Sequence, residues 1–275
     1  MTLSIEAERN RALLGWYAEH GRDLPWRHTT DPYAILVSEV MLQQTQVDRV
    51  IPYYQRFLAK WPTVNALAAA DFADVMRMWS GLGYNSRAKR LLDAARVVAD
   101  TGWPSAPESL AELPGVGPYT AAAVASFAYG ERVAAVDTNT KRVLSRWHGE
   151  MLQQASLQAA ANADVTDDAA AWNQAIMDLG AMVCAPHRPR CDMCPVAEWC
   201  AGPDTYQAPR PQSRFAGSVR QVRGALVRKL VTGTFDIEDL SAATGFAAFS
   251  VEVALADLIE DGIVTEVEDG FSLAG

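Results

Sequence analysis

Hydrophobic residues recur every three or four positions through most of the first two-thirds of the chain, which is the spacing of amphipathic helices. The segments with this pattern are 34–58, 67–79, 86–102, 119–130 and 138–149. Prolines and glycines interrupt the pattern at Pro32, Pro62, Gly81–Gly83, Pro104 and Gly115–Pro118. Because strand-like alternation is absent before residue 215, this part of the chain is predicted to be all-α, with short turns between helices.

The last third of the chain changes character. Residues 202–213 are polar and rich in proline, which is typical of a linker. Helical spacing returns in 218–233, 237–245 and 250–262. Two short apolar segments then flank Glu268, Asp269 and Gly270, which predicts a hairpin. Three helices followed by a hairpin indicate a small α+β module of the winged-helix kind.

The overall charge at first argues against a nucleic-acid partner. The 275 residues carry a net charge of -9, whereas general affinity for DNA comes from neutralising phosphates with Lys and Arg. The charges are unevenly distributed, however. Basic residues gather in 87–90, 141–146 and 210–229, and acidic residues in 164–168 and 252–268. An enzyme with one basic face is compatible with this distribution.

Neither a membrane span nor a secretory signal is visible in the sequence. No apolar run approaches the length needed to cross a bilayer. The N-terminal segment carries Glu6 and Glu8 and lacks a signal-peptide core. We therefore expect a cytoplasmic protein, a monomer without a membrane partner.

All four cysteines fall within one short stretch, with the spacing C-x6-C-x2-C-x5-C. In a cytoplasmic protein this indicates metal ligation before disulfides. Four thiolates in one compact loop can hold a four-iron cluster. Zinc is the alternative, although structural zinc sites usually pair two short knuckles across a longer gap. The spacing favours a structural 4Fe–4S cluster bound by Cys184, Cys191, Cys194 and Cys200.

A glycine-rich turn lies between two predicted helices at Leu113–Gly117. Glycines allow the backbone to turn tightly and to approach a ligand closely. Free N–H groups at the start of the following helix can bind a phosphate. The turn is therefore either a helix-hairpin-helix DNA-binding element or an ordinary connection between helices.

Two carboxylates stand in contexts that suggest chemistry. Asp137 follows a small apolar run and precedes a helix, so it is first of all a candidate N-cap. Glu39 interrupts an apolar helical stretch, and a solvated helix charge is its ordinary interpretation. If Glu39 faces a pocket instead, it can act as a proton donor near neutral pH.

Taken together, these features resemble the helix-hairpin-helix DNA glycosylases that carry an iron–sulfur loop, and within them the A/G-specific adenine glycosylases. The segments that carry the resemblance run in the family's order from about residue 22 to residue 200. They are RDLPWR, SEVMLQQTQV, GLGYNSRAKRL, LPGVGPYTAAAV, VDTNTKRVLSR, WNQAIMDLGAMVC and the cysteine loop.

The resemblance implies an all-α fold of two helical subdomains, with a 4Fe–4S cluster as cofactor. Residues 1–24 and 131–201 would form the iron–sulfur subdomain, and 25–130 the six-helix subdomain with the hairpin. Residues 202–215 would be a linker, followed by the winged-helix-like module at 216–275. That module is too short for the Nudix-like domain that adenine glycosylases usually carry.

The resemblance also assigns roles to individual residues. Asp137 would stabilise the oxocarbenium-like sugar, and Glu39 would protonate adenine as a general acid. Asn139 and Tyr119 would support this pair. The pocket for the extruded adenine would be lined by Arg22, Trp26, Arg27, Leu42 and Gln174.

Further residues would contact the DNA around that pocket. Gln44 and Tyr84 would wedge into the base stack, with Thr45 and Leu82 near the opposite guanine. The backbone of Gly115 and Gly117 would hold phosphate. The expected partner is double-stranded DNA containing adenine opposite 8-oxoguanine or guanine, with cytosine as a further opposite base.

Position 119 bears on the type of reaction. Relatives similar to endonuclease III have a lysine there that forms a Schiff base and cuts the strand, whereas the hydroxyl of Tyr119 cannot form an imine. A monofunctional glycosylase is therefore expected. Two alternatives remain: a thymine or uracil mismatch glycosylase, and a non-enzymatic iron–sulfur DNA-binding regulator. The pairing of Glu39 with Asp137 in their motifs argues against the regulator.

Overall fold

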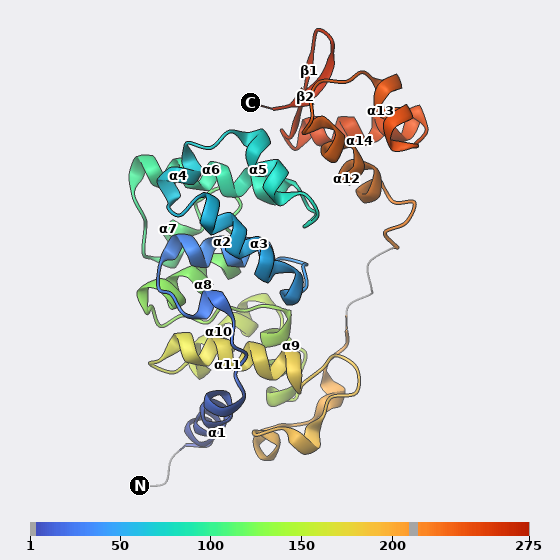
Figure 1. Cartoon of the computed structure of the whole chain (residues 1–275). Helices are drawn as coiled ribbons and strands as arrows, with labels where there is room; N and C mark the ends of the chain where they lie inside the picture. The colour runs from blue at the N-terminus through green and yellow to red at the C-terminus, as the bar shows by residue number, and fades with distance from the viewer. Residues whose placement is uncertain (1–3, 209–213, 275) are drawn as a thin grey trace. The chain divides into compact units, whose positions relative to one another are not determined.

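The computed structural model describes residues 4–208 and 214–274. These residues form helices joined by turns, with one two-stranded sheet near the C-terminus (Figure 1). The α-helices of the first 200 residues are α1 Ile5–His20, α2 Pro32–Leu42, α3 Val47–Lys60, α4 Val64–Ala68, α5 Phe72–Trp79, α6 Ser86–Thr101, α7 Pro107–Leu110, α8 Pro118–Tyr129, α9 Thr138–His148, α10 Gln154–Asp164 and α11 Ala169–Met182. Short 3-10 helices lie at η1 Pro25–Arg27, η2 Cys191–Met193, η3 Ala197–Trp199 and η4 Pro203–Thr205. The prediction of an all-α fold with a small C-terminal α+β module is confirmed.

The described residues divide into two compact units. Unit 1 comprises 4–36, 104–112 and 116–208, and unit 2 comprises 37–103, 113–115 and 214–274. The subdomain boundaries expected from the resemblance stay a prediction. Residues 209–213, which belong to the predicted linker, lie outside the described residues.

Helices α1, α9, α10 and α11 surround the core of unit 1. Leu13, Trp172 and Leu179 are fully buried there. The indole nitrogen of Trp172 donates a hydrogen bond to Asn10 Oδ1 at 3.0 Å, so the one polar atom of this large ring is satisfied inside the core. This packing fixes α9 and α11, the two helices that carry most of the candidate site in unit 1.

Two stretches of continuous helical periodicity are broken in the structure. Residues 34–58 divide into α2 and α3, because Gln44 has a positive φ of 55° and the amide of Thr45 turns back to the carbonyl of Leu42. Residues 67–79 divide into α4 and α5, where Asp71 caps α5 by accepting from the amide of Asp74. In both places polar residues that can satisfy backbone groups locally end one helix and begin another.

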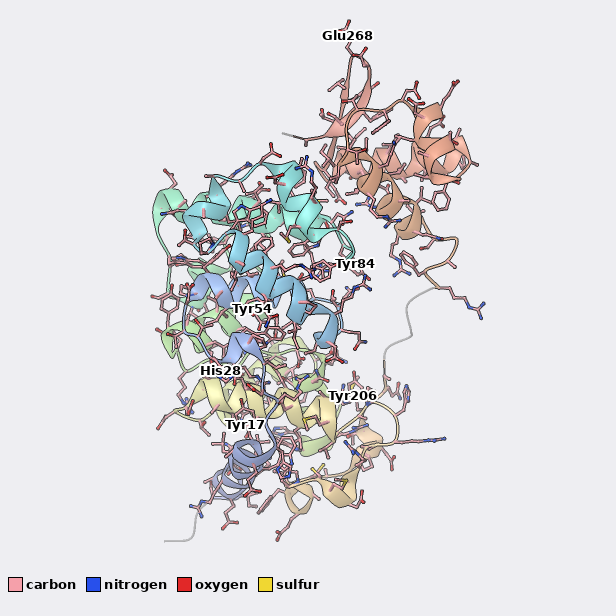
Figure 2. The ribbon with its side chains drawn as sticks, in the orientation of Figure 1. Tyr17, His28, Tyr54, Tyr84, Tyr206 and Glu268 are labelled. Carbon is pink, nitrogen blue, oxygen red and sulfur yellow. The ribbon has the colours of Figure 1, made fainter. Side chains whose placement is uncertain are left out.

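The C-terminal module consists of α12 Val219–Leu230, α13 Ile237–Thr244, α14 Ala248–Glu260, β1 Val264–Val267 and β2 Gly270–Leu273. The strands are antiparallel with Val264 opposite Leu273, and Figure 2 shows Glu268 at the tip of the hairpin. Gly270 is required there, because its φ is 128° and a Cβ would lie 2.5 Å from the carbonyl oxygen of Phe235. The predicted three helices and hairpin are confirmed.

Among the described residues, no single helix has the length and apolar character to span a membrane. Helices α13 and α14 together reach that length and composition, but they are bent by 110° at the break between them.

Candidate active site

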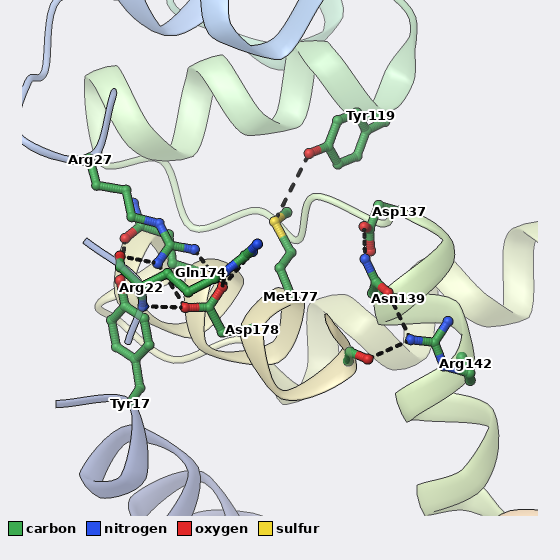
Figure 3. Close-up of polar contacts among 11 residues, drawn as sticks. Tyr17, Arg22, Arg27, Tyr119, Asp137, Asn139, Arg142, Gln174, Met177 and Asp178 are labelled. Atoms are coloured by element: carbon green, nitrogen blue, oxygen red, sulfur yellow. Dashed lines mark hydrogen bonds and ion pairs between the residues drawn. The ribbon is translucent and has the colours of Figure 1, made fainter. Parts of the chain in front are cut away.

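Asp137 is the N-cap of α9. Its Oδ1 accepts a hydrogen bond from the amide of Thr140 at 2.7 Å, and its Oδ2 accepts one from Asn139 Nδ2 at 2.8 Å. The N-cap interpretation is thus confirmed. Because both carboxylate oxygens have donors, the side chain is held in one orientation at the positive end of the helix (Figure 3).

A buried arginine, Arg142, holds Asn139, the residue that donates to the Asp137 carboxylate. Arg142 donates to Asn139 Oδ1 at 2.7 Å, to the carbonyl of Gly180 at 2.7 Å and to the carbonyl of Cys184 at 2.6 Å. Burial lowers the pKa of Arg142 from its usual value. One side chain therefore ties Asp137, through Asn139, to α11 and to the start of the cysteine loop. The sequence analysis did not single out Arg142 as a site residue, although it lies one helical turn after Thr138 in a predicted helix.

Arg22 and Arg27, two of the expected pocket residues, meet at Asp178 on α11. Arg22 Nε donates to Asp178 Oδ1 at 2.7 Å, and the two terminal nitrogens of Arg27 donate to its two oxygens at 2.8 Å (Figure 3). Asp178 is fully buried. Burial alone would raise its pKa, but the hydrogen bonds and charges of the arginines outweigh that effect and lower it. Asp178 was not foreseen.

Gln174 lies one helical turn before Asp178 on α11. Its Oε1 accepts a hydrogen bond from the hydroxyl of Tyr17 on α1 at 2.5 Å, and Arg27 lies over the ring of the same tyrosine at 5.6 Å. Tyr17, also missed from the sequence, thus connects two predicted pocket residues. Arg22, Arg27 and Gln174 are brought into one polar network.

Tyr119 lies on the first turn of α8. Its hydroxyl is 4.0 Å from the sulfur of Met177 on α11, a weak contact that places the ring beside the helix carrying Gln174 and Asp178 (Figure 3). Trp26, another expected pocket residue, is buried and belongs to η1. In the sequence it lies between Arg22 and Arg27.

In unit 2, Glu39 lies on α2 with only 5% of its surface exposed. The interpretation of Glu39 as a solvated helix charge is therefore wrong. The same helix carries the buried residues Val37, Val40 and Met41, so the carboxyl group is surrounded along the chain by apolar positions.

Arg87 on α6 organises the predicted wedge residues. Its guanidinium donates to the carbonyls of Val40 and Met41 at 2.6 and 3.0 Å, closing the end of α2. It also donates to Thr45 Oγ1 at 3.2 Å and lies over the ring of Tyr84 at 5.2 Å. Burial lowers the pKa of Arg87 to about 10, so it stays charged at neutral pH. Sequence reasoning missed Arg87.

Leu82 and Tyr84 belong to the loop between α5 and α6. Leu82 is buried, whereas Tyr84 is 36% exposed and has a positive φ of 50°. A non-glycine residue in this left-handed region is strained, and such strain often accompanies a functional position. Gln44, the other predicted wedge residue, also has a positive φ. Leu42 ends α2 just before it.

The Leu113–Gly117 turn connects α7 and α8. Gly115 has a φ of 74°, and a Cβ there would lie 2.5 Å from the Cβ of Arg90. Gly117 is the N-cap of α8, with Pro118 at the first helical position, so the turn leads directly into a helix start.

The cysteine loop packs on the core of unit 1. Cys184, Cys194 and Cys200 are partly buried against that core, and Cys191 is exposed. Arg146 donates to Cys184 Sγ at 3.1 Å, a contact that stabilises a thiolate. Burial raises the pKa of Cys194 to about 11, so this thiol keeps its proton at neutral pH unless a bound cation replaces it.

In the part of the chain that the structure describes, no group of three or more His, Cys, Asp or Glu side chains converges on one metal position. A zinc ion with Zn–S bonds of about 2.3 Å would need four sulfurs within roughly 4 Å of one another. A four-iron cluster binds one sulfur per iron and so separates them more widely. Four cysteine thiolates suit either group, and their spacing along the sequence favours the four-iron cluster.

Similarity to known proteins agrees with this fold. The family described as HhH-GPD superfamily base excision DNA repair protein matches residues 37–164. The chain is 42% identical to an adenine DNA glycosylase of Mycobacterium tuberculosis, over 96% of this chain and 92% of that protein. It is 41% identical to the human adenine DNA glycosylase, over 85% of this chain and 44% of that protein.

Among solved structures, a thermostable thymine-DNA glycosylase superposes with a TM-score of 0.68 and 32% identity, covering 72% of this chain and 95% of that one.

The chain belongs to the adenine DNA glycosylase family within the HhH-GPD superfamily, and it is a base excision repair enzyme. The alternative of a non-enzymatic regulator is thereby excluded. With 96% of the chain matched to the mycobacterial protein, the C-terminal module is largely within the similarity.

Proposed function

We propose that the enzyme hydrolyses the N-glycosidic bond of adenine mispaired with 8-oxoguanine or guanine, with cytosine as a further opposite base, and that it acts as a cytoplasmic monomer. The observation that carries the proposal is the Asp137 carboxylate, fixed by Thr140 and Asn139. Cleavage of a glycosidic bond creates positive charge on the sugar, and an oriented carboxylate stabilises it.

Glu39 supplies the second half of the chemistry in this proposal. A buried carboxylic acid on an apolar helix donates a proton to the departing base, while Asp137 faces the sugar as the charged partner. The central requirement of the proposal is that both groups act on one extruded nucleotide.

The Arg22–Asp178–Arg27 network supports recognition of the base. Arg27 has both terminal nitrogens on Asp178, and Gln174 is anchored by Tyr17. With their hydrogen-bond geometry fixed in advance, these side chains, together with Trp26 and Leu42, would line the adenine pocket. Gly115 and Gly117 would bind phosphate through their amides. Gln44, Thr45, Leu82 and Tyr84 would contact the DNA around the extruded base.

The four cysteines would hold a 4Fe–4S cluster, which when bound cross-links the loop from Cys184 to Cys200. Arg142 and Arg146 connect this loop to α9 through the carbonyl of Cys184 and its sulfur. In this way the loop would steady the helix that carries Asp137.

The decisive experiment measures base release from duplexes containing adenine, thymine or uracil opposite 8-oxoguanine, guanine or cytosine. We expect release of adenine alone, fastest opposite 8-oxoguanine or guanine. Faster release of thymine or uracil would replace this proposal with a mismatch glycosylase like the thymine-specific structural relative.

Asp137→Asn should lose at least about a thousandfold in rate, because asparagine still caps the helix but carries no charge.

The monofunctional character is tested on the same duplexes. Tyr119 offers no amine, so the product should be an intact abasic strand, cut only after alkali, with no protein–DNA adduct after borohydride. Efficient strand cleavage with a trapped adduct would contradict this part of the proposal.

A further inference from the structure

A cavity of about 600 Å³ lies within unit 2, between the loop at 80–86 and helix α12 of the C-terminal module. Its wall on the α12 side consists of Arg220, Arg223, Gly224, Val227 and Arg228. These positions are spaced i, i+3, i+4, i+7 and i+8, so they form one continuous face of the helix. The apolar positions Val222, Leu226 and Leu230 are buried. Helix α12 thus presents an arginine-rich face to the cavity.

The charge of the cavity is opposite to that of the whole chain. Its lining contains four arginines (Arg49, Arg220, Arg223 and Arg228) and one carboxylate, Asp261, which gives a formal charge of +3, whereas the chain carries -9. Arg223 forms ion pairs with Asp261 and with Asp257. A concentration of positive charge on an acidic protein attracts anions to this place in particular.

The shape of the wall permits close approach of a ligand backbone. Gly224 lies in the interior of α12, where glycine costs about 1 kcal/mol relative to alanine. A Cβ at this position would meet nothing nearer than Arg228 Nη1, at 3.6 Å. The glycine therefore leaves open space in the middle of the arginine face, beside the guanidinium of Arg228.

Aromatic side chains border the same cavity. Tyr84 is 36% exposed and Phe215 is 59% exposed, and Figure 2 shows Tyr84 at the edge of its loop. Exposed aromatic rings beside arginines are the combination that binds nucleic-acid strands, since rings stack on bases or sugars and guanidinium groups bind phosphates. The volume falls in the range of sites that hold one nucleotide-sized group.

We propose that this cavity binds the sugar–phosphate backbone of the substrate DNA, with Arg220 and Arg228 as phosphate ligands, so that the C-terminal module is part of the DNA-binding surface. The inference rests on the proposed function, because it takes the substrate to be duplex DNA. It assigns the module a direct role in holding DNA beside the loop that carries Leu82 and Tyr84.

The test compares Arg228→Ala with Lys229→Ala in the full-length, cluster-loaded enzyme. Both variants remove one positive charge from α12, but Lys229 is not part of the cavity wall and lies over Phe235 instead. We expect Arg228→Ala to weaken binding of an A:8-oxoguanine duplex roughly tenfold, as for loss of one charged hydrogen bond. The slope of log K against log salt should fall by roughly 0.9, and Lys229→Ala should change neither quantity.

A second variant tests the cavity without changing charge. Gly224→Leu places a side chain in the open space beside Arg228 and should stabilise α12 while weakening DNA binding. Equal affinities for Arg228→Ala, Lys229→Ala and Gly224→Leu would overturn the proposal. Weakened binding by Arg228→Ala with an unchanged salt slope would also overturn it, because Arg228 would then contact a base rather than a phosphate. Failure of the wild-type enzyme to release adenine would instead refute the proposed function.

Discussion

At the scale of single residues, Asp178 is a buried charge held by two arginines. It is fully buried, and its two oxygens receive hydrogen bonds from both Arg22 and Arg27. A buried ion pair contributes little net stability compared with an apolar replacement, but removal of one partner leaves the other charge uncompensated. The loss of Asp178 is therefore expected to affect both folding and the positions of Arg22 and Arg27.

We predict that Asp178→Asn lowers the free energy of unfolding by about 3 kcal/mol, because the guanidinium groups of Arg22 and Arg27 lose the carboxylate that pairs with both of them. Urea denaturation measures the change. The matched control is Asp23→Asn, since Asp23 is an exposed carboxylate next to Arg22 in the sequence and pairs with exposed His28. Equal unfolding midpoints for the two variants would contradict the prediction.

The pH dependence of this effect follows from the lowered pKa of Asp178. A carboxylate whose pKa is lower in the folded state stabilises the fold above its unfolded pKa of about 3.9, and this stabilisation disappears as the pH falls through the folded value. The stability difference between wild type and Asp178→Asn should thus stay constant from pH 7 to about 5 and narrow below about 4. Urea titrations at a series of pH values measure it. A difference that already narrows between pH 7 and 5 would point to another titrating group.

Sequence reasoning identified candidate site residues more readily than the residues that hold them in place. Arg22, Arg27 and Gln174 were expected in one pocket, but Asp178 and Tyr17 were not. A motif marks a position along the chain, whereas these partners come from α1 and α11, about 155 residues apart. Likewise Glu39 looked like a surface charge, because its burial depends on packing that a lone helix does not reveal.

At the scale of elements, the close approach of α9 and α11 positions Asp137. Gly180 on α11 faces Asn139 on α9, and a Cβ at position 180 would lie 2.6 Å from the Cβ of Asn139. The absence of a side chain there allows Arg142 to reach the Gly180 carbonyl while it holds Asn139. Glycine is therefore needed at position 180 for the close contact between the helices. Its backbone conformation is helical and would itself accept other residues.

We predict that Gly180→Ala slows base release at least tenfold and destabilises the fold by about 1–3 kcal/mol, because the methyl group forces α9 and its Asp137 cap away from α11. Single-turnover kinetics and urea denaturation provide the measurements. Gly15→Ala is the control, since a Cβ at Gly15 on α1 meets nothing within 4 Å. That substitution should stabilise the protein by up to about 1 kcal/mol. Similar behaviour of the two variants would show that the α9–α11 spacing is not critical.

The hydrophobic pattern predicted the elements better than their limits. It located α6, α8, α9 and the three helices of the C-terminal module. It did not separate α2 from α3, where the break depends on the backbone of Gln44, nor did it single out α1 and α10. The pairing of α9 with α11 was beyond it too, because the spacing of apolar residues shows which face is buried but not against which helix.

At the scale of the whole molecule, the cysteine loop connects local chemistry to the core of unit 1. Val196, from the middle of the loop, is fully buried, and Cys184, Cys194 and Cys200 pack on the same core. Two arginines of α9 reach the loop, Arg142 through the Cys184 carbonyl and Arg146 through the Cys184 sulfur. Loss of order in the loop should therefore be transmitted to α9.

We predict that Cys194→Ser abolishes the visible absorption of an iron–sulfur cluster and increases amide hydrogen exchange in 184–200 and in α9, because the loop loses its cross-link. Absorption spectra of purified protein and exchange mass spectrometry measure the two effects. Met193→Ser is the matched control, since Met193 is the exposed neighbour of Cys194 in the same loop. It should keep both the colour and the exchange protection.

The spread of the exchange change decides between two views of the loop. If increased exchange reaches the first turn of α9 at Thr138 and Asn139, the cluster supports the Asp137 carboxylate through Arg142 and Arg146. A change confined to 184–200, with base release preserved, would limit the cluster to local folding. An unaltered spectrum in Cys194→Ser would remove the cluster from the proposal and leave the four cysteines without an assigned ligand.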